Sequence, residues 1–158
     1  MTALGSVLMH RGFPEEGAAW LADYRTTHGR GVGDLSLGYL SLYQFGWAAL
    51  HRGDVLTAQA FGNRLNGQFA TSNREVYFDV YAILLRGAVA DRLGDEDRAG
   101  ELFGGGLVDA RETGLGELEI VGLTQLAEWY LRARRLPEAR DHARDAAQLA
   151  ERTGLRLR

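Results

Sequence analysis

Residues 46–58 decide the fold, and they read GWAALHRGDVLTA. The apolar first half predicts the end of one helix, and Gly53-Asp54 predicts a tight turn that starts a second helix. Gly46 and Ala58 are small, so two antiparallel helices can approach closely at these positions. The stretch therefore predicts a helical hairpin.

The same pattern returns along the chain at a spacing of 40 or 41 residues. Three registers keep this spacing and agree in phase. Their members are Gly5, Gly46, Gly87 and Ala127; Gly12, Gly53, Gly94 and Arg134; and Gly17, Ala58, Ala99 and Ala139. Such a repeat predicts stacked hairpins, because each hairpin buries its apolar face against its neighbour.

We therefore expect an all-α fold of stacked antiparallel helical hairpins with about seven to eight helices. No segment has the sustained alternation of a strand. The repeat predicts a single domain over 1–158, with units at about 1–33, 34–73, 74–114 and 115–158. The first unit is incomplete, because its first helix would cover only residues 2–11.

Composition sets the broad class. The chain has 158 residues, of which 46% are hydrophobic, so it can bury a core. No apolar run reaches the roughly 18 residues of a membrane span, and the start of the chain lacks the basic region of a signal peptide. We expect a cytoplasmic protein with no membrane partner. The absence of Cys excludes disulfides and thiolate metal sites.

The charged residues are unevenly distributed. All eighteen basic residues are Arg, which is typical of a GC-rich bacterial genome. Residues 1–129 hold ten Arg and seventeen acids, a net charge of -7, whereas residues 130–158 hold eight Arg and four acids, a net charge of +4. A basic end can contact nucleic acid or an acidic partner. A solvated helix face accounts for it more simply, so direct nucleic-acid binding is not expected.

The repeat unit resembles the tetratricopeptide repeat, whose signature is W-x2-L-G-x2-Y followed by A-x3-F. The matching residues are Leu123, Leu126, Ala127, Tyr130 and Ala139 in the fourth unit, Gly87, Ala99 and Phe103 in the third, and Phe45, Gly46 and Ala58 in the second. The resemblance covers nearly the whole chain. It implies a right-handed superhelix in which the first helix of each hairpin lines the concave face.

The period of 40 to 41 residues is longer than the tetratricopeptide period of about 34 residues. Long repeats of this kind are similar to the repeat arms of MalT-type and large LuxR-type bacterial regulators, SARP-type activators and STAND signalling ATPases. In those proteins the repeats form an interaction or sensor arm. HEAT-like repeats have a similar period and are the alternative.

The resemblance places the candidate binding residues in the concave groove. The partner-binding candidates are Tyr43, Trp47, His51, Tyr77, Tyr81, Asp91, Arg92, Glu128 and Arg132, with Leu84, Ala88 and Thr124 on the same face. Aromatic side chains favour peptide binding because they supply a large rigid area at small entropy cost. The alternative is that Tyr43, Tyr77 and Tyr81 belong to the core between hairpins.

Nothing in the sequence points to catalysis, a metal or a cofactor. The four His residues are too scattered to form a metal-ligand pair, and Gly29-x-Gly31-x-Gly33 lacks the strand and the Lys of a phosphate loop. We therefore predict a non-enzymatic protein- or peptide-binding module, the interaction or sensor arm of a bacterial transcriptional regulator or signalling protein. A small-molecule sensor, with a pocket enclosed by the helices, is the alternative.

Two further features belong to the packing of the array. Gly104-Gly105-Gly106 lies inside a predicted helix, where each Gly costs about 0.5–1 kcal/mol relative to Ala. Either another backbone packs closely there or the helix is kinked. The ends of the array lack polar capping helices, which predicts a homo-oligomer formed through the uncapped ends.

Overall fold

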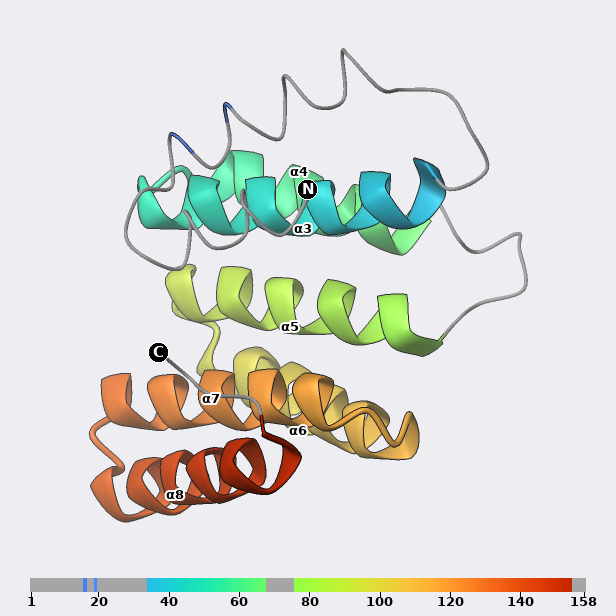
Figure 1. The fold of residues 1–158 in the computed structure, drawn as a ribbon. Helices are drawn as coiled ribbons and strands as arrows, with labels where there is room; N and C mark the ends of the chain where they lie inside the picture. The colour runs from blue at the N-terminus through green and yellow to red at the C-terminus, as the bar shows by residue number, and fades with distance from the viewer. Residues whose placement is uncertain (1–15, 17–18, 20–33, 68–75, 155–158) are drawn as a thin grey trace. The chain divides into compact units, whose positions relative to one another are not determined.

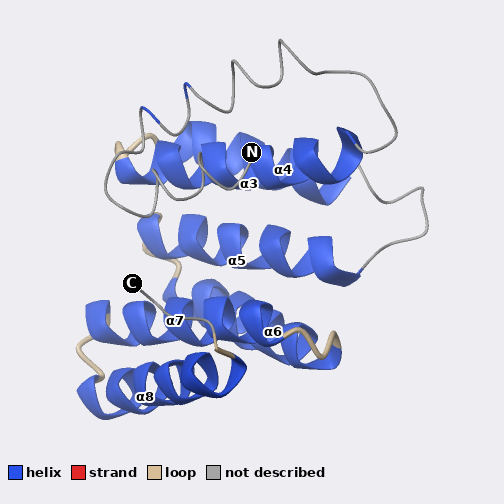
Figure 2. Ribbon diagram, in the orientation of Figure 1, coloured by secondary structure: helices blue, strands red, loops and turns tan. Residues whose placement is uncertain are grey.

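The computed structural model describes residues 34–67 and 76–154, together with Glu16 and Ala19, and it describes side chains over 42–66 and 79–154. These residues form six α-helices and no strand (Figures 1 and 2). The helices are α3 (Asp34–His51), α4 (Val55–Gly67), α5 (Val76–Arg92), α6 (Glu96–Glu112), α7 (Gly116–Arg132) and α8 (Leu136–Thr153). The all-α prediction is confirmed. The predicted first hairpin lies outside the described residues.

Contacts between residues divide the chain into two compact units, Met1–Ser72 and Asn73–Arg158. In the first unit, α3 packs against α4. In the second, α5 packs on α6, α6 on α7 and α7 on α8, and α5 also contacts α7. The three hairpins fall within the predicted ranges 34–73, 74–114 and 115–158. None of the described helices combines the length and the apolar character needed to cross a membrane.

The turn between α3 and α4 is closed by two backbone hydrogen bonds. The Gly53 N–H donates to the Leu50 carbonyl at 3.0 Å, and the Asp54 N–H donates to the Ala49 carbonyl at 2.9 Å. This pair of bonds is the Schellman motif, which satisfies the last carbonyls of a helix when the residue after the cap takes a positive φ. Gly53 meets that requirement with φ 78°.

The same backbone motif recurs at the other two hairpin turns. Equivalent hydrogen bonds close the turns at Gly94-Asp95 and at Arg134-Arg135. The φ angle is 80° at Gly94 and 58° at Arg134, which is the non-glycine residue with positive φ in the described part of the chain. Arg134 therefore occupies the glycine position of the repeat, as the sequence register predicted.

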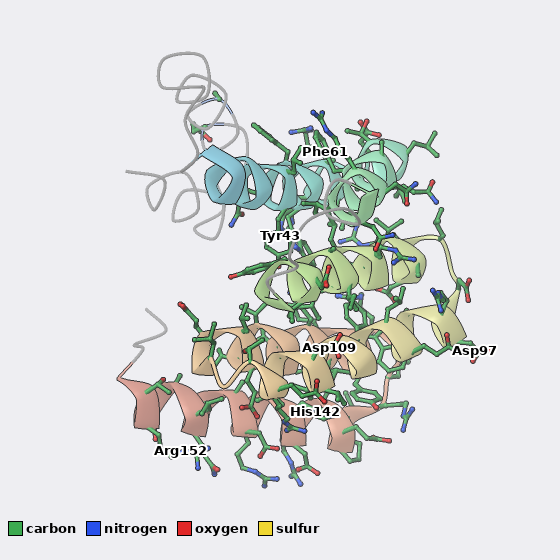
Figure 3. The ribbon with its side chains drawn as sticks, turned by 90° about the vertical axis from the view of Figure 1, so that its right-hand side faces the viewer. Tyr43, Phe61, Asp97, Asp109, His142 and Arg152 are labelled. Carbon is green, nitrogen blue, oxygen red and sulfur yellow. The ribbon has the colours of Figure 1, made fainter. Side chains whose placement is uncertain are left out.

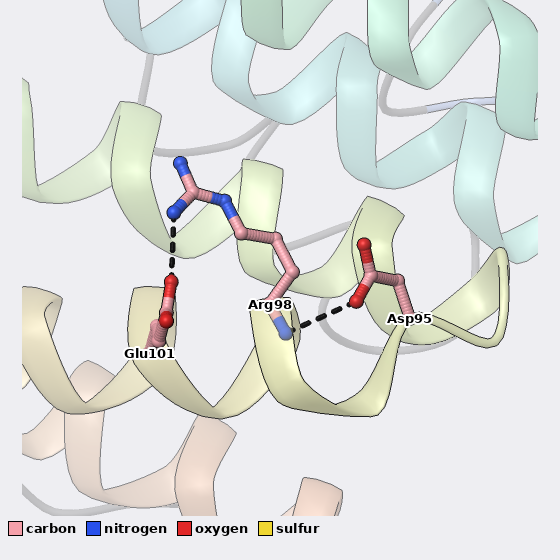
Figure 4. A network of polar contacts seen from close by, with 3 residues as sticks. All are labelled: Asp95, Arg98 and Glu101. Atoms are coloured by element: carbon pink, nitrogen blue, oxygen red, sulfur yellow. Dashed lines mark hydrogen bonds and ion pairs between the residues drawn. The ribbon is translucent and has the colours of Figure 1, made fainter.

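The residue after the glycine position caps the second helix in two of the turns. Asp54 accepts a hydrogen bond from the Thr57 N–H at 3.1 Å, and Asp95 accepts one from the Arg98 N–H at 3.2 Å (Figure 4). Hydrogen bonds from Thr57 lower the pKa of the Asp54 carboxyl below its usual range. Arg135 takes this position in the third turn and makes no side-chain cap.

We expect Arg134→Gly to raise the free energy of unfolding by about 0.5–1 kcal/mol. A side chain in the left-handed region costs about 1–2 kcal/mol, and Gly removes this strain. Part of the gain is offset because Gly loses more backbone entropy on folding than Arg does. Urea denaturation followed by circular dichroism measures the change. The matched control is Gly94→Ala, which puts a side chain at the equivalent position and should be destabilising. A destabilised Arg134→Gly protein would show that the Arg134 side chain stabilises the turn.

Small residues let the helices of the second unit pack closely. A Cβ at Gly87 of α5 would lie 2.9 Å from Cε1 of Phe103 on α6, and a Cβ at Gly100 of α6 would lie 2.9 Å from Cη2 of Trp129 on α7. Phe103 is completely buried. Each glycine therefore provides the space for an aromatic ring of the next helix, and Phe103 and Trp129 form the centre of this core.

The glycine run on α6 does not kink the helix, which continues from Glu96 to Glu112. A Cβ at Gly106 would lie 3.0 Å from Cδ2 of Leu84, so α5 packs closely at that position. A Cβ at Gly104 or Gly105 would meet nothing within 4 Å. Close packing therefore explains Gly106, and nothing in the structure explains Gly104 or Gly105.

The outer side of α8 is polar. Its buried residues are Ala139, Ala146 and Ala150, and over 138–153 its fully exposed side chains are charged, polar or alanine. Figure 3 shows Arg152 pointing outward from this helix. Apart from Leu136, which is 60% exposed, the surface of α8 is therefore polar. Self-association stays a prediction, and α8 offers it little apolar area.

Candidate functional site

The most continuous accessible part of the predicted groove is one stripe along α7. Its members are spaced four, three, four and four residues apart, which places them on one helical face. They are Glu117, Val121, Thr124, Glu128 and Arg132, and each is exposed or half-buried. The predicted groove residues Thr124, Glu128 and Arg132 therefore share one surface.

An ion pair joins this stripe to the end of α5. Arg132 Nε donates to Asp91 Oδ2 at 2.7 Å, and Arg132 Nη1 lies 4.0 Å from Glu128 Oε2. The Asp91 side chain is only 11% exposed, whereas that of Arg132 is 41% exposed. The pair connects two consecutive repeats, and it holds the guanidinium at the edge of the accessible surface.

The predicted groove residues of α5 are divided between core and surface. Leu84 is completely buried and packs at Gly106 of α6, and Ala88 is 4% exposed, so these two residues belong to the core and their assignment to the groove was wrong. Tyr81 and Asp91 are half-buried, and Arg92 is exposed. The side chain of Tyr77 lies outside the described residues.

The predicted residues of α3 form a ladder of rings. The centroids of Tyr43 and Trp47 are 6.1 Å apart, and those of Trp47 and His51 are 6.2 Å apart. Tyr43 is 5% exposed, Trp47 is half-buried and His51 is exposed. Accessibility therefore increases along the helix, and Trp47 and His51 are the members that a ligand could reach. For Tyr43 the core interpretation fits better.

The turn end of α7 and α8 carries a cluster that the sequence analysis did not identify as a unit. The His142 ring stacks on Tyr130 with centroids 5.3 Å apart and planes at 2°, and the Arg135 guanidinium lies 4.6 Å from the centroid of the same Tyr130 ring. The one sequence signal for this cluster is that Tyr130 matches the Tyr of the tetratricopeptide signature.

Arg135 also forms an ion pair within this cluster. Its Nε and Nη2 donate to Glu138 Oε1 at 2.8 and 2.6 Å. The Glu138 carboxylate raises the pKa of the Arg135 guanidinium, and the guanidinium lowers the pKa of the Glu138 carboxyl below its usual range. Arg135 therefore stabilises the first turn of α8 through an ion pair. At the equivalent position of the other two turns, Asp54 and Asp95 cap the second helix instead.

Four buried polar atoms have no hydrogen-bond partner among the described residues: Trp47 Nε1, Gln125 Oε1, Trp129 Nε1 and His142 Nδ1. Gln125 and Trp129 are four residues apart on α7 and thus lie on one face. Over residues 34–67 and 76–154, no group of three His, Asp or Glu side chains is placed to hold a metal ion. The polar groups that the described residues offer a ligand are therefore ion pairs and single hydrogen-bonding atoms, and not a cluster of metal ligands.

Comparison with models of protein families and with curated proteins gives no match to this chain.

Proposed function

We propose that the chain is a non-enzymatic, protein- or peptide-binding helical-repeat module of the tetratricopeptide-like kind. Its role would be that of an interaction or sensor arm in a bacterial transcriptional regulator or signalling protein of the cytoplasm. In each unit the accessible face of a first helix would bind a partner, with Trp47 as an apolar anchor in the first unit and Glu128 and Arg132 as orienting charges in the second.

The observation that carries this proposal is the stripe on α7. Glu128 is 51% exposed at its side chain and Arg132 is 41% exposed, and the two groups lie 4.0 Å apart. A carboxylate and a guanidinium held side by side can accept and donate hydrogen bonds to a peptide backbone or to charged side chains. Because Asp91 fixes Arg132 from α5, little side-chain entropy is lost when a partner binds there.

A charge reversal on this stripe tests the proposal. We expect Glu128→Lys to weaken binding of a partner peptide by about five- to tenfold, because it replaces an acceptor with a like charge beside Arg132. Peptides are first selected on the immobilised full chain from a displayed random library. Fluorescence anisotropy then measures the affinity of each selected peptide for the wild type and the variant.

The chain offers a matched control in Glu101 of α6. Its side chain is 68% exposed and pairs with Arg98 at 2.8 Å (Figure 4). Glu101→Lys therefore makes the same charge change on a second helix of a hairpin and should leave binding unchanged. The proposal fails if the library gives no enriched peptide, or if both reversals weaken binding equally.

Trp47→Ala extends the test to α3. We expect it to weaken selected peptides that bind at α3 at least as much as Glu128→Lys weakens those that bind at α7, since a Trp anchor supplies a large apolar contact area. Leu56→Ala is the control, because Leu56 is 75% exposed on α4 of the same unit. A Trp47→Ala protein that is folded by circular dichroism and binds like the wild type would remove Trp47 from the site.

A small-molecule sensor remains the second candidate. Gln125 Oε1 and Trp129 Nε1 favour it, because a buried acceptor and a buried donor on one helical face could both bond to a small polar ligand. The peptide selection separates the two functions. Peptides whose affinity depends on Glu128 support the protein-binding module. A small-molecule sensor would instead gain thermal stability from its ligand, and it would bind no peptide in a way that depends on Glu128.

A further inference from the structure

The α7–α8 turn departs from the other two turns in a way that the fold does not require. Where the first two turns have Gly-Asp, the third has Arg134-Arg135 on the same backbone motif. It therefore has a side chain in the left-handed region, with φ 58°, and no side-chain cap on the following helix. The ion pair of Arg135 with Glu138 makes up for the missing cap, but the left-handed conformation disfavours Arg134. The fold alone therefore gives no reason for an Arg at position 134.

The three Arg residues of the turn differ in their intramolecular partners. Arg132 is bonded to Asp91, and Arg135 is bonded to Glu138 and packs on Tyr130. The Arg134 side chain makes no hydrogen bond or ion pair with any residue in the described part of the chain. The two partnered guanidinium groups are held in place and keep donors in reserve, since Arg has five N–H groups. Arg134 adds a charge that no described acid neutralises.

Exposed leucines flank these charges in the sequence. Leu131 is 58% exposed and Leu136 is 60% exposed, and both belong to the small set of large hydrophobic side chains that the structure leaves open to solvent. The turn thus presents Leu131-Arg-Ala-Arg-Arg-Leu136 as an accessible segment that is both basic and apolar. Such a surface is complementary to a segment that carries carboxylates and an apolar side chain.

A nucleic acid fits this surface less well than a peptide. Nucleic-acid affinity comes from several Lys or Arg residues that each neutralise a phosphate. Two of the three Arg residues of this turn already pair with Asp91 and Glu138, which leaves too few charges to neutralise a series of phosphates. A nucleic acid would also leave the two leucines exposed. We propose that the α7–α8 turn, residues 131–136, is a docking surface for an acidic peptide segment that also carries an apolar side chain.

This inference rests on the proposed function and specifies the chemistry of the partner. Arg132 belongs both to the turn and to the accessible stripe on α7, so the two surfaces are continuous. If the partner lies along α7, its acidic segment would reach the turn and contact Arg134.

The test uses the full chain and a fluorescein-labelled peptide of repeated Asp-Glu-Leu units as the probe. Anisotropy should show binding that weakens with added salt. A peptide with Ser in place of Leu should bind less tightly, and one with Lys in place of the acids should not bind. Arg134→Gly should weaken binding of the probe by about five- to tenfold. It removes the guanidinium of the turn that has no ion pair with a described residue, and it leaves the turn backbone intact.

Arg152→Ala provides the matched control, since Arg152 is exposed at the far end of α8 and the charge change is the same (Figure 3). It should change the affinity by less than about twofold. The inference is overturned if the wild type does not bind the probe, or if Arg134→Gly and wild type bind it equally. It is also overturned if a single-stranded oligonucleotide binds more tightly than the probe and depends on Arg134. If it fails while library-selected peptides still depend on Glu128, the proposed function stands without it.

Discussion

Replacing Phe103 by Ala should lower the free energy of unfolding by about 3–5 kcal/mol, the largest effect that we expect from a single substitution in this chain. Phe103 is completely buried on α6. Its ring fills the space left by Gly87 on α5 and lies 6.3 Å from the Trp129 ring on α7. Its loss therefore leaves a cavity that three helices border, and no single side chain can close it.

Urea denaturation followed by circular dichroism measures this loss, and hydrogen exchange locates it. Because the contacts form two compact units, amides of α5, α6 and α7 should lose protection more than those of α3 and α4. Val108→Ala is the control on the same helix, since Val108 is 53% exposed, and it should change stability by no more than about 0.5 kcal/mol. Equal losses in the two variants would mean that Phe103 does not anchor this core.

The turns were the part of the fold that the sequence predicted best. A turn is a local structure, and its requirement for positive φ shows directly in the residue type at Gly53 and Gly94. The repeat spacing then identified Arg134 as an equivalent position, although an Arg gives no local sign of a left-handed backbone. The repeat spacing therefore predicted a turn position that the conformational preference of Arg alone does not predict.

The site was harder to predict, because helical spacing does not say which neighbour covers a face. Leu84 and Glu128 were both assigned to the groove, yet Leu84 packs at Gly106 and Glu128 is exposed. Polarity separates these two residues in hindsight, because the charged Glu128 is exposed and the apolar Leu84 is buried. The ion pair of Asp91 with Arg132 depends on the packing of α5 against α7, which no local pattern encodes.

The glycine run on α6 shows the same limit. The sequence indicated either a close approach or a kink at Gly104-Gly105-Gly106, and the answer differs between neighbouring residues. Gly106 faces α5 and needs its small size, whereas Gly104 and Gly105 face open space on a continuous helix. Adjacent residues point 100° apart around a helix, so one member of a run can be required while the next is not.

One substitution, Gly to Ala, should therefore have opposite effects at two positions of the second unit. Gly87→Ala should lower the free energy of unfolding by about 1–2 kcal/mol, because a Cβ there lies 2.9 and 3.0 Å from two atoms of the buried Phe103 ring. Gly105→Ala should raise it by about 0.5–1 kcal/mol, because the new methyl group meets nothing within 4 Å and Ala favours the helix.

The clash at Gly87 can be separated from any other effect of the methyl group by a double-mutant cycle. Phe103→Leu removes the ring atoms nearest to Gly87, so Gly87→Ala should cost less in that background than in the wild type. Chemical denaturation of the four proteins gives the coupling energy, and Gly105→Ala with Phe103→Leu should show none. If Gly87→Ala costs the same in both backgrounds, the small residue at this repeat position is not there to admit the Phe103 ring, and the hairpin packing needs another explanation.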